Sequence, residues 1–355
     1  MRVKESDKTT RDDLKTMQAW SLQRKIQVTQ LRIMEWYEHY NGKVYVSFSG
    51  GKDSTVLLDL ARRVYPDIES VFVDTGLEYP EIRQFVKQHE NVTILRPKMR
   101  FDEVIKKYGY PVISKAVSNA ISEARYNISS GTDSLRYRQL RGDEKDKNGN
   151  PSIYNMEKWA FLIDSPFKIT DRCCGIMKKN PFHQYERNSG KKPLVGVMTE
   201  ESQQRESKWY RQGCNAFTTN HPQSTPMAFW TEQDVLQYLK ITGLPYCSVY
   251  GDVVADNEGQ TELFETTKHY HCTGLDRTGC MFCMFGVHLE KEPNRFQRMK
   301  ITHPKQYDYC IKDEYSYIEY IPYIGDNGEL TLDEIEHTKN GLGLGKVLDY
   351  INVKY

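Results

Sequence analysis

The stretch Lys43-Val44-Tyr45-Val46-Ser47-Phe48-Ser49-Gly50-Gly51-Lys52-Asp53-Ser54 decides the fold. Its first six residues favour a β-strand, and the glycines that follow favour a turn. Residues 53–64 then repeat apolar side chains at helical spacing. A strand, a glycine turn and a helix therefore follow one another.

Strands and helices continue to alternate beyond this point. We expect strands at 70–74, 92–95 and 194–198, and helices at 80–89 and 232–241. This alternation predicts βαβ units, hence an α/β fold with a parallel sheet covered by helices on both faces. In such sheets ligands bind beyond the carboxyl ends of the strands. The turns at 49–51 and 74–76 follow strands and should lie at that edge.

The loop from Ser49 to Ser54 has the chemistry of a phosphate site. Two adjacent glycines let the backbone approach an anion closely. The N–H groups at the start of the next helix point toward that anion, with the positive end of the helix dipole behind them. Lys52 adds a charge, and hydroxyl donors are supplied by Ser47, Ser49 and Ser54. The spacing of a Walker A loop is absent, so a different phosphate loop is expected.

Four segments of the chain resemble motifs of the phosphoadenosine phosphosulfate (PAPS) reductase family of the PP-loop ATP pyrophosphatases, and they occur in the same order as in that family. They are residues 49–54, 74–80, the Cys-Cys-x-x-x-Lys-x-x-Pro segment at 173–181, and the Gly-x-x-x-x-Glu-Ser-x-x-Arg segment at 196–205. The resemblance covers about residues 40–290. It implies an adenine nucleotide alpha-hydrolase-like (HUP-type) fold.

The resemblance also implies roles by position. The residues expected to contact ATP are Ser47, Ser49, Gly50, Gly51, Lys52, Asp53, Ser54, Val73, Asp74, Thr75, Gly76, Gly196, Glu201 and Ser202. The residues expected to act in catalysis are Lys52, Asp53, Ser54, Lys178 and Arg205. Lys178, Lys179 and Arg205 would approach an anionic substrate. Mg²⁺ would bridge the phosphates, with Asp53 helping to hold it.

Two departures separate the chain from the sulfonucleotide reductases of this family. Those enzymes tend to replace the Gly-Lys-Asp-Ser part of the loop, whereas this chain keeps Lys52 and Ser54, as ATP-cleaving members do. It also has no Glu-Cys-Gly-(Leu/Ile)-His segment, and Cys310 is its last cysteine. We therefore expect cleavage of ATP between its α and β phosphates, with PAPS or APS reduction as the alternative.

The cysteines suggest a metal site. Cys173 and Cys174 are adjacent, and Cys280 and Cys283 form a CxxC. Four thiolates suit either a [4Fe–4S] cluster or tetrahedral zinc, and a site without metal stays open. The pattern is similar to the cluster-binding cysteines of assimilatory APS reductases, and the family's sulfur-activating enzyme of DNA phosphorothioation also carries a cluster. Cys272 or Cys214 can replace one member of the adjacent pair. The nearby histidines receive no role: His269, His271 and His288.

Length and composition bound the remaining possibilities. A chain of 355 residues suggests about two domains. We expect an N-terminal helical segment at 1–41 and a nucleotide-binding domain at 42–245 with a mobile insertion at about 127–152. A C-terminal α+β region with the CxxC would fill 246–355. No apolar run approaches the ~20 residues that span a bilayer. Residues 1–11 do not resemble a signal peptide, so a cytoplasmic protein is expected.

The expected activity is that of an ATP-dependent adenylating enzyme, a transferase that prepares an acceptor for sulfur transfer. The acceptor is an anionic small molecule or a nucleic acid, and the sequence does not choose between them. A sulfur-donor protein such as a cysteine desulfurase is an expected partner, as is a homo-oligomer or a larger complex. A further alternative is a nucleic-acid-binding component of a modification complex, because residues 208–211 and 294–300 mix cations with aromatic side chains.

Overall fold

The computed structural model describes residues 9–256, 268–324 and 329–355, which form two compact units. The sheet unit combines the chain up to Lys98 with Lys178–Gly279. The cysteine unit combines Met99–Met177 with Cys280–Tyr355. The predicted domain boundaries after residues 41 and 245 do not coincide with these divisions and remain predictions. The first eight residues of the predicted N-terminal helical segment lie outside the described residues.

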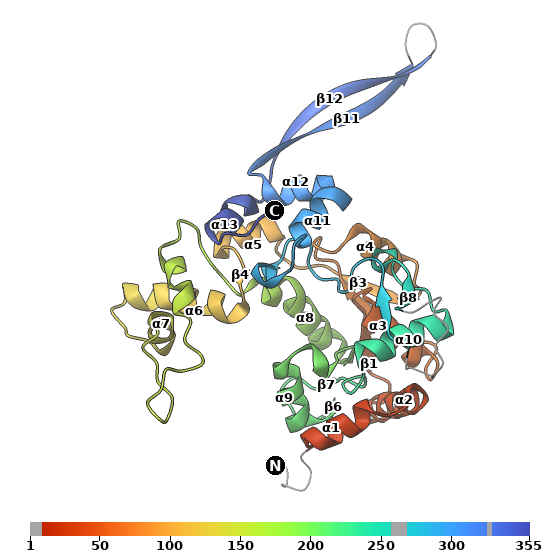
Figure 1. Ribbon diagram of the computed structural model, residues 1–355. Helices are drawn as coiled ribbons and strands as arrows, with labels where there is room; N and C mark the ends of the chain where they lie inside the picture. Colours follow the sequence, from red (N-terminus) through yellow and green to blue (C-terminus); the bar gives the residue numbers. More distant parts are fainter. Residues whose placement is uncertain (1–8, 257–267, 325–328) are drawn as a thin grey trace. The chain divides into compact units, whose positions relative to one another are not determined.

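Six strands form the central sheet of the sheet unit, in the order β3-β2-β1-β5-β7-β6 (Figure 1). Neighbouring strands are parallel except for β6 with β7. The bounds are β1 Val44–Ser47, β2 Ser70–Val73, β3 Val92–Leu95, β5 Lys192–Val195, β6 Asn215–Ala216 and β7 Gln223–Ser224. The predicted α/β fold is confirmed. The strand order reverses between β1 and β5, and such a reversal is where open α/β sheets bind ligands.

Helices cover both faces of the sheet. The helices of this unit are α1 Arg11–Gln18, α2 Leu22–His39, α3 Lys52–Arg62, α4 Pro80–Lys87, α8 Asn180–Ser189, α9 Gln203–Gln212 and α10 Glu232–Thr242. Side chains of a strand alternate between faces. On one face Val46 joins the core cluster that contains Leu57 of α3. On the other face Tyr45 stacks on Phe182 of α8, with ring centroids 6.1 Å apart. The sheet unit also contains the short hairpin of β8 Val253–Ala255 and β9 Tyr270–Cys272.

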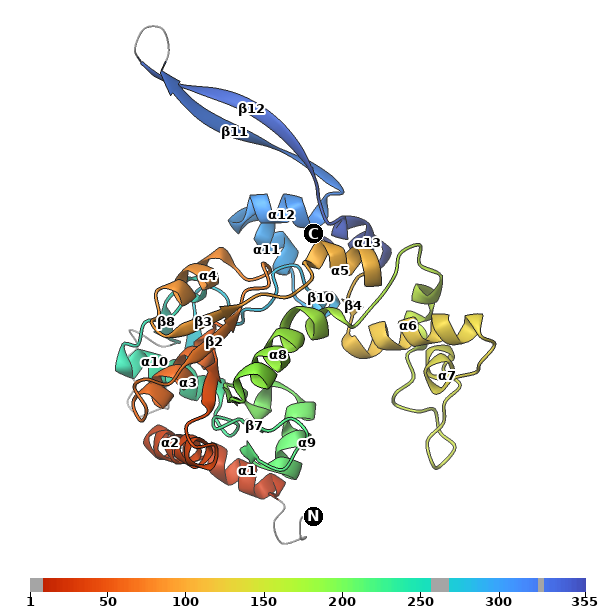
Figure 2. The same ribbon diagram turned by 180° about the vertical axis from the view of Figure 1, so that it is seen from behind.

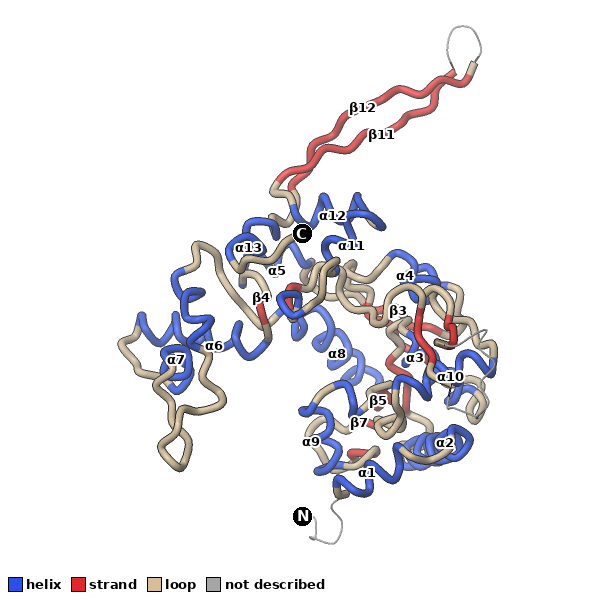
Figure 3. The backbone as a smooth tube through the Cα atoms, viewed as in Figure 1, coloured by secondary structure: helices blue, strands red, loops and turns tan. Residues whose placement is uncertain are grey.

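The cysteine unit is a mixture of helices and strands. Its elements are α5 Phe101–Tyr108, β4 Val112–Ile113, α6 Lys115–Ser129, α7 Leu135–Arg141, η2 Glu157–Asp164, β10 Met284–Phe285, η6 Val287–Leu289, α11 Arg295–Thr302, α12 Pro304–Ile311, β11 Glu314–Ile324, β12 Leu330–Asn340 and α13 Leu344–Tyr350. β11 and β12 pair as one long antiparallel ribbon that extends away from α12 and α13 (Figures 2 and 3). The π-helix η3, Gly175–Lys179, joins this unit to the sheet unit.

The insertion predicted as a loop at about 127–152 contains regular structure. α6 ends at Ser129 and α7 spans Leu135–Arg141, so the loop prediction was wrong for these residues. Ser134 caps α7 by accepting the N–H of Tyr137, and Gly142 ends the helix in the left-handed conformation. The helix is short and polar, so its apolar periodicity is weak.

None of the described helices has the length and apolar character needed to cross a membrane.

A buried ion pair joins the N-terminal helices to the rest of the sheet unit. Nζ of Lys25, on α2, lies 2.6 Å from Oδ2 of Asp234, and the Lys25 side chain is only 2% exposed. The same carboxylate accepts the backbone N–H of Thr231 at the start of α10. Removing the lysine would leave a buried carboxylate without its counter-charge.

We therefore expect Lys25→Ala to destabilise the protein by about 3–5 kcal/mol, the usual consequence of breaking a buried ion pair at one side. Urea unfolding followed by circular dichroism measures this. The matched control is Lys15→Ala, an exposed lysine of α1, which should change stability by less than about 0.5 kcal/mol. Equal effects of the two substitutions would contradict a structural role for the pair.

Candidate nucleotide-binding site

The loop between β1 and α3 requires glycine at position 50. Gly50 has a φ of +73°, which favours glycine. A Cβ at this position would lie 2.8 Å from Cγ2 of Val86 and 2.9 Å from Cγ2 of Ile82, both on α4. The loop therefore packs directly against a helix. Gly51 is the N-cap of α3, and no described side chain caps this helix. Its first turn is the kind of helix N-terminus that binds anions.

Two of the predicted hydroxyl donors brace the loop. Oγ of Ser54 accepts the N–H of Ser49 at 3.2 Å and donates to the carbonyl of Gly51 at 2.9 Å. The hydroxyl oxygens of Ser49 and Ser54 are 3.0 Å apart. Thr55 also donates to the carbonyl of Gly51. These hydroxyls fix the shape of the loop, a role that the sequence did not reveal.

Lys52 is buried at the first turn of α3 and is 2% exposed. Its Nζ lies 3.0 Å from Oε1 of Glu232 and donates to the carbonyl of Asp276. The ammonium also lies 5.4 Å from the ring centroid of Tyr250. Burial lowers the pKa of Lys52, but Asp53 and Glu232 outweigh it and the net shift is upward. Lys52 is therefore a fixed positive charge at the loop.

Asp53 places an unsatisfied oxygen beside this charge. Oδ1 of Asp53 is buried and accepts no hydrogen bond from the described residues, and it lies 4.0 Å from Nζ of Lys52. Burial raises the pKa of the carboxyl, while the charges of Lys52, Arg277 and Arg205 oppose that rise. A carboxylate oxygen with spare capacity is a donor of the type that Mg²⁺ prefers. Asp53 thus fits the magnesium role expected of it.

The second motif forms a braced turn at the end of β2. Glu78 accepts the N–H and the hydroxyl of Thr75, and Asp74 accepts from the N–H of Gly76. Gly76 has a φ of +76°. Arg83 pairs with Asp74 at 2.9 Å. The residues chosen from the sequence are thus engaged with one another at the carboxyl edge of the sheet.

A small cavity of about 90 Å³ connects the two strand ends. Ser47 and Ser49 line it from the β1 side and Val73 from the β2 side. Lys178 also lines it, and its Nζ lies 3.9 Å from Glu78. The loop, the second motif and the lysine of the third motif therefore meet at one place in the sheet unit.

The segment after β5 approaches the loop from the other side. A Cβ on Gly196 would lie 3.2 Å from the carbonyl oxygen of Asp53, so this approach depends on a glycine. Ser202 caps α9 by accepting the N–H of Arg205, and Arg205 forms an ion pair with Glu201. Arg277 lies 4.0 Å from the same glutamate. Predicted residues of the fourth motif thus border the phosphate loop.

Several residues of this site carried no recognisable sequence signal. Tyr250 accepts the backbone N–H of Lys52 and shares a hydrogen bond with Thr278 at 2.7 Å. Glu232, on α10, forms an ion pair with Lys52. The backbone carbonyl of Asp276 accepts a hydrogen bond from the Lys52 ammonium. Glu232 is the first residue of a helix that the sequence predicted. The only sequence signal for Glu232 was its position at a helix start, and acidic residues are common there whatever their function.

The four predicted metal ligands all lie in the cysteine unit. Sγ of Cys173 is 4.0 Å from Sγ of Cys174. The Cys174 thiol, burial, and the charges of Cys283 and Cys280 all raise the pKa of Cys173. Among the described residues, no three His, Cys, Asp or Glu side chains are gathered closely enough to hold a metal ion. Four cysteine sulfurs are the ligand type that iron–sulfur clusters and zinc use. Metal binding by this chain remains a prediction.

The alternative cysteines belong to the sheet unit. Cys214 is buried and its sulfur accepts the indole N–H of Trp209. Cys272 is buried within β9. All eight cysteines lie in the described part of the chain, and none forms a disulfide.

The two basic runs also differ in their surroundings. Residues 208–211 lie on α9. In the run at 294–300, Arg295 and Arg298 share the carboxylate of Glu290, so the charge of one of these two cations is offset.

Comparison with known proteins identifies sequence relatives. An uncharacterized protein of Methanocaldococcus jannaschii is 40% identical over 87 residues, which are 22% of this chain and 21% of that protein. A second uncharacterized protein of that organism is 42% identical over 84 residues, 22% of this chain and 18% of that protein. The match thus spans about a fifth of the length of these relatives. An adenosine 5'-phosphosulfate reductase of Lysinibacillus sphaericus is 24% identical over 218 residues, 61% of this chain and 72% of that protein.

A solved structure of Candida glabrata FMN adenylyltransferase covers 71% of this chain and 74% of its own, with 13% identity and a TM-score of 0.34, too distant to inform function. The family match covers more than half of the chain. The phosphoadenosine phosphosulfate reductase domain matches residues 43–115 and 102–284, a span that contains the loop, the second motif, both cysteine pairs and Arg205. The chain therefore belongs to the phosphoadenosine phosphosulfate reductase domain family.

Proposed function

We propose that this chain binds ATP at the loop 49–54, releases pyrophosphate, and transfers the adenylyl group to an anionic acceptor. Sulfur then attacks the adenylated acceptor, and AMP leaves with the bonding electron pair. The observation that carries the proposal is the pairing, at the first turn of α3, of a buried Lys52 with an Asp53 oxygen that accepts no hydrogen bond from the described residues. A cation and a metal-binding carboxylate are the two groups that a polyphosphate requires.

The chain's own residues can perform the binding steps. The triphosphate would lie against the first turn of α3, where backbone N–H groups and the helix dipole favour negative charge. Lys52 now pairs with Glu232. A phosphate would compete with that glutamate for the ammonium. The acceptor oxygen attacks the α-phosphorus, the bond to the β-phosphate breaks, and pyrophosphate leaves with the electron pair.

Asp53 would hold Mg²⁺ through its unsatisfied oxygen. The metal ion would neutralise charge that develops on the phosphates during cleavage. Arg205 and Arg277 lie close enough to act electrostatically on Asp53, and they would oppose the negative charge of the α-phosphate and the acceptor.

The cysteine unit would supply the sulfur side of the reaction. We propose that Cys173, Cys174, Cys280 and Cys283 hold a [4Fe–4S] cluster, because four thiolates of one unit are its usual ligand set. A cluster held by these four cysteines would supply iron to which sulfur can bind, and a donor protein such as a cysteine desulfurase would be the source of the sulfur. A colourless zinc site is the competing outcome.

The relatives named adenosine 5'-phosphosulfate reductase favour a second candidate, reduction of a sulfonucleotide. In that reaction a thiol reductant such as thioredoxin supplies two electrons, and sulfite and AMP leave while the dithiol becomes a disulfide. Sulfite released from APS by reduced thioredoxin and this protein would favour this candidate over ATP cleavage.

Lys52→Ala should reduce pyrophosphate release from Mg·ATP by at least about 100-fold, the usual loss when one group that stabilises transition-state charge is removed. A coupled pyrophosphate assay, run with candidate oxyanion acceptors, measures this. Lys87→Ala removes an exposed lysine of α4 and should leave the rate unchanged. A Lys52→Ala variant that is folded and fully active would refute the role of Lys52.

Gly50→Ala should weaken ATP binding and destabilise the protein by about 1–3 kcal/mol, because the methyl group meets α4 and the backbone is left-handed. The control is Gly149→Ala, which shares the positive φ of +84° but has nothing within 4 Å of the new Cβ. Calorimetry with ATP and thermal unfolding separate the two effects. If both variants bind ATP equally well, the close packing of the loop does not shape the site.

Protein purified without oxygen should contain about four irons per chain and absorb broadly near 400 nm. Elemental analysis and absorption spectroscopy check this. Cys283→Ser should lose the iron, whereas Cys310→Ser should keep it, since Cys310 is fully buried in α12. Stoichiometric zinc, or neither metal, would contradict the cluster.

A further inference from the structure

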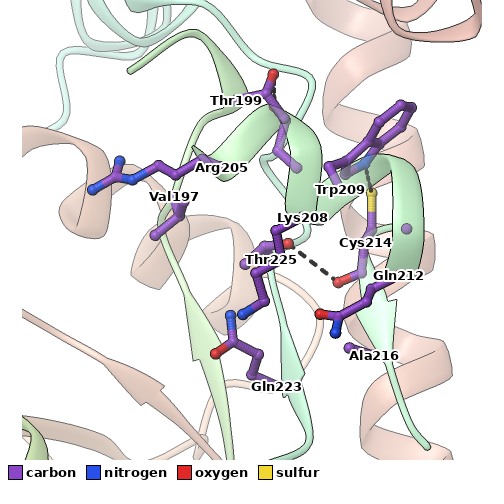
Figure 4. A pocket seen from close by; sticks show the side chains of 12 residues that line it. Val197, Thr199, Arg205, Lys208, Trp209, Gln212, Cys214, Ala216, Gln223 and Thr225 are labelled. Carbon is purple, nitrogen blue, oxygen red and sulfur yellow. Dashed lines mark hydrogen bonds between the residues drawn. The ribbon is translucent and has the colours of Figure 1, made fainter. Parts of the chain in front are cut away.

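A second and larger cavity lies under α9 in the sheet unit. It has a volume of about 200 Å³ and is lined by α9 and by residues at and beyond the ends of β5, β6 and β7 (Figure 4). We call it the α9 cavity. Pockets for drug-sized ligands measure about 300–1,000 Å³, so this cavity suits a metabolite-sized group and not a second nucleotide.

One side of the α9 cavity carries positive charge that no carboxylate balances. Lys208 is solvent-exposed, lines the cavity, and has no ion-pair or hydrogen-bond partner among the described residues. Burial and then the charge of Lys179 lower the pKa of Lys208, so the two lysines repel each other. A bound anion would relieve that repulsion and would gain charge-assisted hydrogen bonds.

The cavity also contains an unsatisfied amide oxygen. Oε1 of Gln212 is buried and accepts no hydrogen bond from the described residues. In Figure 4 the polar ends of Lys208, Gln212 and Gln223 point toward one another, while Val197 and Ala216 give the cavity apolar wall. A buried acceptor without a donor costs about 1–3 kcal/mol, so this oxygen is available to a group that donates a hydrogen bond.

Two observations place one wall of the cavity near the start of α3. Arg205 lines the cavity, and its charge also acts on Asp53 at the start of α3. Val197, another lining residue, follows Gly196, whose Cβ position is 3.2 Å from the carbonyl oxygen of Asp53. A molecule in the cavity would therefore lie next to the phosphates of a nucleotide in the loop.

We propose that the α9 cavity is the acceptor pocket and that it takes a small organic oxyanion, held by Lys208, with a hydrogen-bond donor that faces Gln212. This rests on the proposed function, because it names the acceptor side of the same reaction. A carboxylate and a phosphate share the required chemistry. Arg205, between the cavity and the loop, would direct the acceptor oxygen toward the α-phosphorus.

Lysine footprinting tests the proposal with inorganic phosphate and with hydroxymalonate as probes, each of which carries a hydroxyl donor. The protein is treated with acetic anhydride, and the acetylation rate of each lysine is read by peptide mass spectrometry. We expect at least one probe to slow acetylation of Lys208 several-fold and to leave the exposed Lys87 unchanged. The preferred probe distinguishes a phosphate from a carboxylate acceptor. Unchanged acetylation of Lys208 with both probes would overturn the proposal.

A non-hydrolysable ATP analogue separates the two sites. Protection of Lys208 should persist when the analogue fills the loop; protection that disappears would show that the anion binds in the loop, and would overturn the proposal. Calorimetry with the protecting probe, in the presence of the analogue, should give an affinity at least about tenfold weaker for Lys208→Ala than for Lys15→Ala, the loss expected for one charged hydrogen bond. Equal affinities would also overturn it. If the analogue does not bind at all, the proposed ATP binding is refuted. The footprint measured in the absence of the analogue then still tests whether the α9 cavity binds an anion.

Discussion

The buried charge of Lys52 is the constraint on which the rest of the site depends. An ammonium withdrawn from water costs several kcal/mol unless it is paired. The protein satisfies it with Glu232 from α10, a carbonyl at Asp276 and the face of Tyr250. These groups all come from a part of the chain that lies far beyond the loop in sequence, from Glu232 to Asp276. Contacts with this one lysine therefore bring three parts of the chain together at one edge of the sheet: the loop, α10 and the segment before residue 279.

Glycines make this convergence possible. Gly50 lets the loop contact α4, and Gly196 lets the segment after β5 reach the backbone of Asp53. The loop thus contacts α4 as well as the segment after β5, while the first turn of α3 keeps its anion-binding character. Arg205 extends positive charge from the loop toward the α9 cavity. Nucleotide and acceptor would then meet at a single positively charged boundary.

Much of this arrangement could be predicted from local sequence. The strand, glycine turn and helix around Ser49–Ser54 have strong local signals, and the alternation of elements predicted the parallel sheet. The bracing by Ser49 and Ser54 could not be predicted, because a hydroxyl can face either an anion or its own backbone. Tyr250 and Glu232 were missed because their role arises only from tertiary packing against Lys52. α7 was missed because a short polar helix has little periodicity.

The cysteines illustrate a different limit. Their spacing predicted a common metal site, and among the described residues no three His, Cys, Asp or Glu side chains are gathered closely enough to hold a metal ion, so this site stays a prediction. Spacing does not specify which metal, because iron–sulfur clusters and zinc accept the same thiolates.

The most direct measurement compares the affinities of two nucleotides by calorimetry in the presence of Mg²⁺. One is a non-hydrolysable ATP analogue with a methylene between its α and β phosphates, and the other is adenosine 5'-phosphosulfate. A loop with a paired Lys52 and an available Asp53 oxygen should bind the ATP analogue at least about tenfold more tightly, since one added charged contact gives that ratio. Tighter binding of the sulfonucleotide, or no binding of the ATP analogue, would contradict an ATP-cleaving function.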